Sequence, residues 1–190
     1  MIIALEGLCY AGKTTTCKVL CQIQKDLFPV AEYSKLINPS KFPDYKCRTK
    51  ESIIFFIKLE KIRQKIIKEK IKEGLIPVLD RSFISCIAFD YAMCKMGIKN
   101  KNFWKTTEKL FLTQNFILPD IIFFFDVSQV EIKTRAKENP CKMPSFFVNV
   151  KFNQFFKEFI VSQHHIPVKI INANVEPETV MKQVLTKFKP

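Results

Sequence analysis

The chain alternates short, continuous apolar runs with longer segments in which apolar side chains recur every three or four residues. Runs of the first kind are typical of strands buried on both faces, and segments of the second kind predict amphipathic helices. We expect strands at 2–6, 31–36, 75–79, 121–125 and 168–171. We expect helices at 13–27, 51–73, 83–96, 102–116, 128–138, 148–163 and 177–188. This alternation predicts an α/β fold, a three-layer sandwich with a five-stranded parallel sheet covered by helices on both faces.

A glycine loop joins the first predicted strand to the first predicted helix. The segment from Gly7 to Thr15 (Gly-Leu-Cys-Tyr-Ala-Gly-Lys-Thr-Thr) fits the G-x-x-x-x-G-K-[ST] pattern, and its two glycines are half of the 4 in the chain. A chance match in a glycine turn is the alternative, but strand, loop and helix in this order predict a phosphate-binding P-loop. The sequence therefore predicts a single P-loop NTPase domain over 1–190.

The residues of this loop suit ATP and Mg²⁺. Glycines allow backbone conformations in which successive N–H groups face one anion, and the following helix N-terminus adds positive potential. The Lys13 side chain can contact the β and γ phosphates, and the Thr14 hydroxyl can bind Mg²⁺. We therefore expect the cofactor site to comprise Gly7, Tyr10, Ala11, Gly12, Lys13, Thr14 and Thr15.

A second signal follows the strand predicted at 75–79. Val78-Leu79-Asp80-Arg81-Ser82 is an apolar run that ends in an acid, the Walker B arrangement that orients Mg²⁺. Arg81 would project into the same crevice, where its fork of donors suits a phosphate. An Asp-Arg pair that merely caps the next helix is the alternative. Beside a P-loop, the pattern favours Asp80 as a metal residue together with Thr14.

Composition limits the classes of protein. The chain has 190 residues, 47% of them hydrophobic, which is enough for a sizeable core. It has no apolar stretch of about 18 residues, the length that a membrane span needs, and it opens directly into a strand rather than a secretion signal. The seven cysteines are odd in number and contain no C-x-x-C. We therefore expect a cytoplasmic protein with reduced thiols, without a membrane, disulfides or zinc.

The charge is strongly positive, with 31 Lys and Arg against 18 Asp and Glu, a net +13. Nucleic acid or an acidic membrane surface would suit such a charge, and so would an anionic substrate such as a nucleotide. The lysines are scattered over the predicted helices instead of forming one block, and no RNA-binding motif is visible. The pattern favours a nucleotide and makes nucleic acid an unlikely partner.

Several motifs, in order and at the right separations, resemble the thymidylate kinase branch of the nucleoside monophosphate kinases. The similarity spans nearly the whole chain. It is carried by Leu5-Glu6-Gly7 through Thr15, Gly74 through Arg81, Ser85 with Ala88 and Phe89, Pro119-Asp120 through Asp126-Val127, and Arg135. The resemblance implies ATP-dependent phosphoryl transfer to a nucleoside monophosphate, most like a dTMP kinase.

The resemblance also implies roles for individual residues. Lys13, Thr14 and Thr15 would hold ATP and Mg²⁺, Arg81 would contact the acceptor phosphate, and Arg135 would contact the transferring group from a lid at about 135–147. Lys13, Arg81 and Arg135 are thus the expected catalytic residues. An ordinary solvated loop is the alternative to the lid. The family further implies a homodimer, in keeping with residues 53–57, which are apolar all round their helix, although a buried internal turn would also explain them.

The chain departs from the family pattern at the acceptor site. Cys9 replaces an acid that meets the acceptor sugar, and Asp90 replaces a Gln. Phe55 is kept for stacking on the base, whereas the Arg expected at Leu59 is absent and Arg63, one turn further on, could substitute. Tyr45 takes the position of an acceptor-phosphate Arg, with Arg48 close by. We expect the substrate site to comprise Cys9, Arg48, Phe55, Arg63, Arg81, Ser85 and Asp90, with Asp90 in solvent beside a lysine as the alternative.

These departures leave the acceptor and the class of protein open. A deoxynucleoside kinase, or a nucleotide-binding regulatory protein that has lost acceptor specificity, are the alternatives to a dTMP-like kinase. Arg81 and Arg135 favour an enzyme, because a mere ATP-binding protein needs no arginine aimed at an acceptor phosphate. A Ras-like GTPase is less compatible, since the chain has no Asn-Lys-x-Asp motif.

Overall fold

The structure, a computed structural model, describes residues 1–44, 49–138 and 145–188. Its centre is a sheet of five strands in the order β2-β3-β1-β4-β5, and each neighbouring pair is parallel. The strands are β1 (Ile3–Gly7), β2 (Leu27–Val30), β3 (Ile76–Asp80), β4 (Ile121–Asp126) and β5 (Val168–Asn172). The predicted five-stranded parallel sheet is confirmed.

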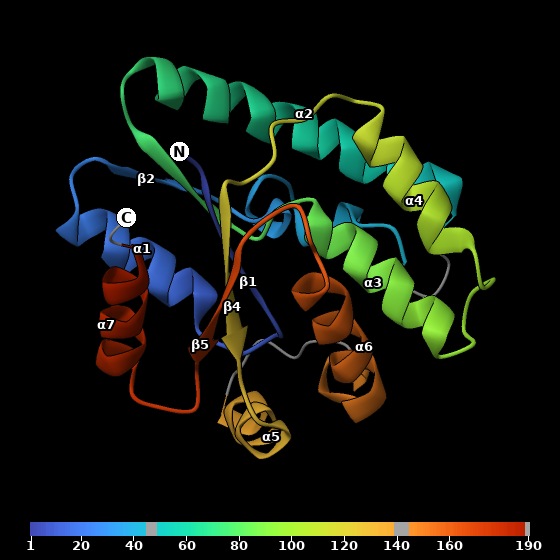
Figure 1. The fold of residues 1–190 in the computed structure, drawn as a ribbon. Helices are drawn as coiled ribbons and strands as arrows, with labels where there is room; N and C mark the ends of the chain where they lie inside the picture. Colours follow the sequence, from blue (N-terminus) through green and yellow to red (C-terminus); the bar gives the residue numbers. More distant parts are fainter. Residues whose placement is uncertain (45–48, 139–144, 189–190) are drawn as a thin grey trace.

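Helices cover both faces of the sheet (Figure 1). They are α1 (Lys13–Ile23), α2 (Lys50–Lys72), α3 (Ile84–Lys95), α4 (Phe103–Leu112), α5 (Gln129–Glu138), α6 (Val150–Val161) and α7 (Pro177–Phe188). Short 3₁₀ turns lie at η1 (Tyr33–Lys35), η2 (Pro39–Lys41) and η4 (Ser145–Val148). In Figure 1, α1 and α7 lie on one side of the sheet, and α3, α4 and α6 lie together on the other. Among the helices that the structure describes, none is long and apolar enough to cross a membrane.

The hydrophobic core follows from this double cover. Phe123, Phe124 and Phe125 are consecutive residues of β4 with no solvent exposure, although neighbouring side chains of a strand point to opposite faces. A run of this kind is stable only where both faces are packed, as in parallel sheets. The continuous apolar runs of the sequence are thereby explained.

One predicted strand is wrong. We expected a strand at 31–36 after a helix reaching residue 27, whereas α1 ends at Ile23, β2 spans Leu27–Val30 and residues 33–35 form a 3₁₀ turn. Pro29 argues against a central strand because it has no N–H for the ladder, but β2 lies at the edge of the sheet, where proline is tolerated. The fourth helix also ends earlier than predicted, at Leu112.

Helix ends follow the local signals in the sequence. Gly74, just beyond α2, has a left-handed φ of 79°, which ends the helix at little conformational cost. Ser128 precedes α5, and its Oγ accepts a hydrogen bond from the Glu131 N–H at 3.2 Å. Because all five strands run in parallel, their carboxyl ends meet at one edge of the sheet, where open α/β sheets bind ligands.

Candidate active site

The P-loop leaves the carboxyl end of the central strand through a close backbone approach. Gly7 has a φ of 137°, and a Cβ at this position would lie 2.6 Å from the Phe125 carbonyl oxygen. Tyr10 and Gly12 also have positive φ, at 63° and 83°, and α1 begins at Lys13. The first glycine is therefore required by the contact with β4, and the second by its left-handed backbone.

Three basic side chains from different elements converge on carbonyl oxygens of this loop. Lys13 Nζ, at the start of α1, donates to the Leu8 carbonyl at 2.6 Å. Arg81 Nη1, directly after β3, donates to the Gly7 carbonyl at 2.9 Å. Arg135 Nη1, from α5, donates to the Tyr10 carbonyl at 3.0 Å. The loop thus concentrates positive charge that suits a ligand with several anionic oxygens.

The surroundings of Lys13 disfavour its charged form. Burial lowers the pKa of Lys13 from its ordinary 10.5 to about 8, and the nearby Arg81 guanidinium adds repulsion in the same direction. Cys9, Asp80 and Glu32 oppose this shift. A bound polyanion would supply the negative charge that this ammonium lacks.

The predicted metal residues are in contact. Thr14 Oγ1 donates to Asp80 Oδ2 at 2.6 Å, and the Asp80 side chain is buried. The second carboxylate oxygen, Asp80 Oδ1, is buried and has no hydrogen-bond partner among the residues that the structure describes. A buried carboxylate oxygen without a partner, beside a hydroxyl, fits Mg²⁺, which takes oxygen ligands and binds proteins through one or two carboxylates.

Arg81 lies at the border between the P-loop and a neighbouring pocket. Its backbone is left-handed, with a φ of 66°, and its Nη1 lies 3.3 Å from Ser85 Oγ. Its Nη2 lies 3.7 Å from Cys9 Sγ, and its Nε lies 3.8 Å from Glu32 Oε2. Ser85 also donates to Glu6 Oε2, so its hydroxyl connects the Arg81 guanidinium to the Glu6 carboxylate. Cys9, Ser85 and Arg81, three of the predicted substrate residues, are therefore brought together.

The pocket beside Arg81 contains residues that the sequence did not single out. It is lined by Gly7, Leu8, Cys9, Arg81, Phe147, Phe152, Asn153 and Phe156. Asn153 Nδ2 donates to Gln129 Oε1 at 3.0 Å, and the buried Asn153 Oδ1 has no hydrogen-bond partner in the described part of the chain. In the sequence, α6 shows only an apolar helical face, which is typical of core packing, and an asparagine within such a face was the one signal.

Other predicted substrate residues lie elsewhere. Arg63 has no solvent exposure and forms an ion pair with Glu60 at 2.9 Å, so it does not face a base as expected. Asp90 is also fully buried, and its Oδ2 accepts from Thr107 Oγ1 at 2.7 Å, so its carboxylate lies in the interior against α4 and not in solvent. Both corrections have the same cause. Asp90 is covered by α4 and Arg63 by the backbone after β3, and a sequence pattern cannot distinguish such covered helix faces from pocket walls.

Phe55 is half-buried and packs edge-on against Phe42 and Phe56. It belongs to an aromatic cluster near η1 and is not among the residues that line the pocket beside Arg81. Arg48 and Tyr45 lie outside the described residues.

Arg135 has two further anchors. Its Nε pairs with Glu131 Oε1 at 2.7 Å, and its Nη2 donates to the Ala173 carbonyl at 2.9 Å. It therefore connects α5 to the P-loop and to the segment after β5. The predicted lid, 135–147, begins in α5 and ends in η4, and its central residues 139–144 lie outside the described ranges.

Known proteins resemble this chain over nearly its whole length. Residues 5–184 match the family model described as thymidylate kinase. A thymidylate kinase of Buchnera aphidicola subsp. Acyrthosiphon pisum is 28% identical, over 98% of this chain and 93% of that protein. A thymidylate kinase of Mycoplasma capricolum is 24% identical, over 97% and 92%.

Solved structures share the fold at lower identity. A deoxyadenosine kinase from M. mycoides with bound dATP superposes with a TM-score of 0.75 and 18% identity, covering 100% of both chains. A thymidylate kinase from Ehrlichia chaffeensis gives a TM-score of 0.64 and 20% identity, covering 100% of this chain and 98% of that one.

Proposed function

Because this chain belongs to the thymidylate kinase family, we propose that its site transfers the γ-phosphoryl group of ATP to dTMP or a closely related nucleoside monophosphate. The chain is a nucleotide kinase, and the convergence of Lys13, Arg81 and Arg135 on one loop is the observation that carries the proposal. Phosphoryl transfer needs little covalent chemistry from the protein, since charge neutralisation and in-line positioning account for most of its catalysis.

We assign the donor side to the P-loop. The N–H groups around Gly7, Tyr10, Ala11 and Gly12, together with Lys13, Thr14 and Thr15, would hold the ATP phosphates. Thr14 and Asp80 would hold Mg²⁺, which would supply positive charge to neutralise the phosphates. The hydrogen bonds that Lys13 and Arg135 make to loop carbonyls would be replaced by bonds to phosphate oxygens.

We assign the acceptor side to the pocket beside Arg81. The Arg81 guanidinium, which Ser85 holds in place, would bind the acceptor phosphate. The unpartnered Asn153 Oδ1 could accept a hydrogen bond from a sugar hydroxyl, a task for which the Cys9 thiol is a poor acceptor. Phe147 and Phe156 supply apolar walls for the rest of the nucleoside.

The experiment is an ATP-coupled assay with dTMP, dUMP, dCMP, dAMP and the matching nucleosides. We expect ADP formation to depend on a monophosphate and to be fastest with dTMP, and to disappear in Lys13→Ala. Turnover that does not require any acceptor, or that persists in Lys13→Ala, would remove the proposal.

A deoxynucleoside kinase is the second candidate, and one observation favours it. Glu32 places a carboxylate 3.8 Å from Arg81, with its side chain 31% exposed. This carboxylate would repel an acceptor phosphate, whereas it could accept a hydrogen bond from a nucleoside hydroxyl. The nucleoside arms of the same assay distinguish the two candidates.

A homodimer and a cytoplasmic location stay predictions. Part of the apolar segment 53–57 is internal, since Ile53 and Ile57 are buried, but Ile54 and Ile62 of α2 are 41% and 48% exposed. Exposed isoleucines on one helix support a second copy as the partner of this surface. Light scattering at micromolar concentration should give the mass of two chains, and the mass of one chain would contradict the dimer.

A further inference from the structure

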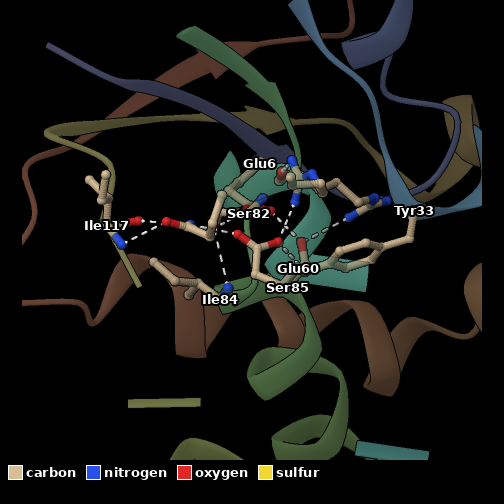
Figure 2. A network of polar contacts seen from close by, with 10 residues as sticks. Glu6, Tyr33, Glu60, Ser82, Ile84, Ser85 and Ile117 are labelled. Atoms are coloured by element: carbon tan, nitrogen blue, oxygen red, sulfur yellow. Dashed lines mark hydrogen bonds and ion pairs between the residues drawn. The ribbon is translucent and has the colours of Figure 1, made fainter. Parts of the chain in front are cut away.

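A buried polar network joins α2 to the ends of β1 and β3 (Figure 2). Arg63 Nη1 pairs with Glu60 Oε2 at 2.9 Å, and both side chains are essentially without exposure. Tyr33 Oη donates to the same Glu60 oxygen at 2.7 Å, and Gln64 Nε2 donates to Glu60 Oε1 at 2.8 Å. Burial by itself lowers the pKa of Arg63, but attraction to Glu60 and Tyr33 outweighs it and raises the pKa, so the guanidinium is a buried cation.

The second terminal nitrogen of Arg63 leaves this network and reaches the backbone of the site. Arg63 Nη2 donates to the Arg81 carbonyl at 2.5 Å. On the opposite side, the Ser82 N–H donates to Glu6 Oε1 at 2.7 Å. The Arg81 carbonyl and the Ser82 N–H belong to one peptide group. This peptide is therefore held between a buried cation on its oxygen and a buried carboxylate on its nitrogen (Figure 2).

The φ torsion of Arg81 links the position of this peptide to the direction of the Arg81 side chain. Arg81 has a φ of 66°, a conformation that is unfavourable for a residue with a Cβ and that persists only where neighbours enforce it. Its own N–H donates to the Leu5 carbonyl at 3.1 Å. With that N–H fixed, rotation about the Arg81 N–Cα bond would displace the 81–82 peptide and end the left-handed φ. The same rotation would swing the Arg81 side chain and take the guanidinium away from Gly7 and Ser85.

From these contacts we propose that Arg63 is a positioning residue, which holds the Arg81–Ser82 peptide and thereby aims the Arg81 guanidinium at the acceptor phosphate. The inference rests on the proposed function for the identity of that acceptor, but its structural part does not. Arg63 lies one turn after Leu59, the position of the family's base-contacting Arg. The inference therefore replaces base contact with peptide positioning as the role of Arg63.

The test removes the three ionisable side chains of the network together, so that no buried charge or hydroxyl loses its partner. Gln64 Nε2 loses Glu60 but keeps its 3.3 Å contact with the Ile117 carbonyl. The variant Tyr33→Phe/Glu60→Leu/Arg63→Met replaces the ion pair by apolar side chains of similar volume, a change that proteins often tolerate. Tyr33→Phe alone is the matched control, because it perturbs the same network and leaves the Arg63 bond to Arg81 in place. Arg63→Lys is a second variant, because one ammonium lacks the two separate nitrogens with which the guanidinium reaches Glu60 and the Arg81 carbonyl.

Two readouts separate positioning from stability. Amide hydrogen exchange should show Ser82 protection about ten- to hundredfold lower in the triple variant and in Arg63→Lys, with Val78 of β3 unchanged, as expected for loss of one charge-assisted hydrogen bond. The kcat/KM for dTMP should fall by a similar factor, while the Kd for ATP stays within about twofold. Tyr33→Phe should leave both readouts at the wild-type level.

Wild-type Ser82 protection and wild-type acceptor kcat/KM in both Arg63 variants would overturn the inference and leave Arg63 as a core ion pair. A loss of Ser82 protection without loss of acceptor kcat/KM would also overturn it. If the wild-type protein phosphorylates no monophosphate, the proposed function fails instead, and Ser82 exchange still decides whether Arg63 holds the peptide.

Discussion

The protonated Lys13 side chain should lower the free energy of unfolding of the protein. Its side chain is 5% exposed, and the lowered pKa of about 8, against an ordinary 10.5, means that the folded state disfavours the ammonium. At 1.36 kcal/mol for each pH unit, this difference corresponds to about 3 kcal/mol at pH 7, where both states are protonated. Lys13→Met removes this penalty and also removes the hydrogen bond to the Leu8 carbonyl, which is worth about 1 kcal/mol for a neutral donor.

We therefore expect Lys13→Met to raise the free energy of unfolding by about 2 kcal/mol at pH 7, and Tm by about 4–8 °C for a chain of this length. The same variant should lose at least about a hundredfold in turnover, because an electrostatic contact to the transferring group is absent. Sites that stabilise charge in the ligand are often costly to the empty protein, and Lys13 would be an example.

The stability difference between Lys13→Met and the wild type should depend on pH. Between about pH 8 and 10.5 the unfolded wild-type chain holds the Lys13 proton more often than the folded one, so wild-type stability from this group rises with pH. The advantage of Lys13→Met should therefore shrink above pH 8 and nearly vanish at about pH 9.5. Urea unfolding of both proteins at pH 7 and 9.5, at one ionic strength, measures it. A variant less stable than wild type at pH 7, or a pH-independent difference, would refute the reasoning.

Three further outcomes are expected. Arg81→Lys should lower acceptor-dependent turnover with little change in the Kd for ATP, because an ammonium cannot reproduce the guanidinium fork; an equal loss of ATP affinity, measured by calorimetry, would place Arg81 on the donor side. Gly7→Ala should lower the free energy of unfolding by more than about 2 kcal/mol, since its Cβ would meet the Phe125 carbonyl, whereas Gly97→Ala, with open space around it, should cost only about 1 kcal/mol; equal losses in urea unfolding would contradict the close approach. Asp90→Asn should leave the ratio of dTMP to dCMP turnover unchanged, because Asp90 is buried against Thr107, and a tenfold change in that ratio would restore it as a base-contacting residue.

The elements and the phosphate loop could be predicted because their signals are local. Gly7 and Gly12 stand at fixed spacing between an apolar run and a helical pattern, and Asp80 ends another apolar run. Short stretches of sequence were therefore enough to predict the P-loop and the position of Asp80 at a strand end. β2 was misplaced because Leu27 continues the periodicity of the preceding helix, and Pro29 is compatible with a strand only at the edge of a sheet.

The buried polar residues could not be assigned from the sequence. Glu60, Arg63 and Gln64 lie on a helix rich in charged side chains, where such residues are usually solvated. Their burial depends on Tyr33 and on the backbone at Arg81 and Ile117, which are distant in sequence. Asn153 presents the reverse case, a polar residue on an apolar face whose neighbours are known only after α6 packs beside the P-loop.

The most direct test of the central claim is to follow the γ-phosphoryl group itself. ATP labelled at that group, incubated with Mg²⁺, dTMP and the wild-type protein, should yield label in dTDP at the rate at which ADP appears, with no transfer in Lys13→Ala. Label recovered only as inorganic phosphate, with none in dTDP, would contradict the account.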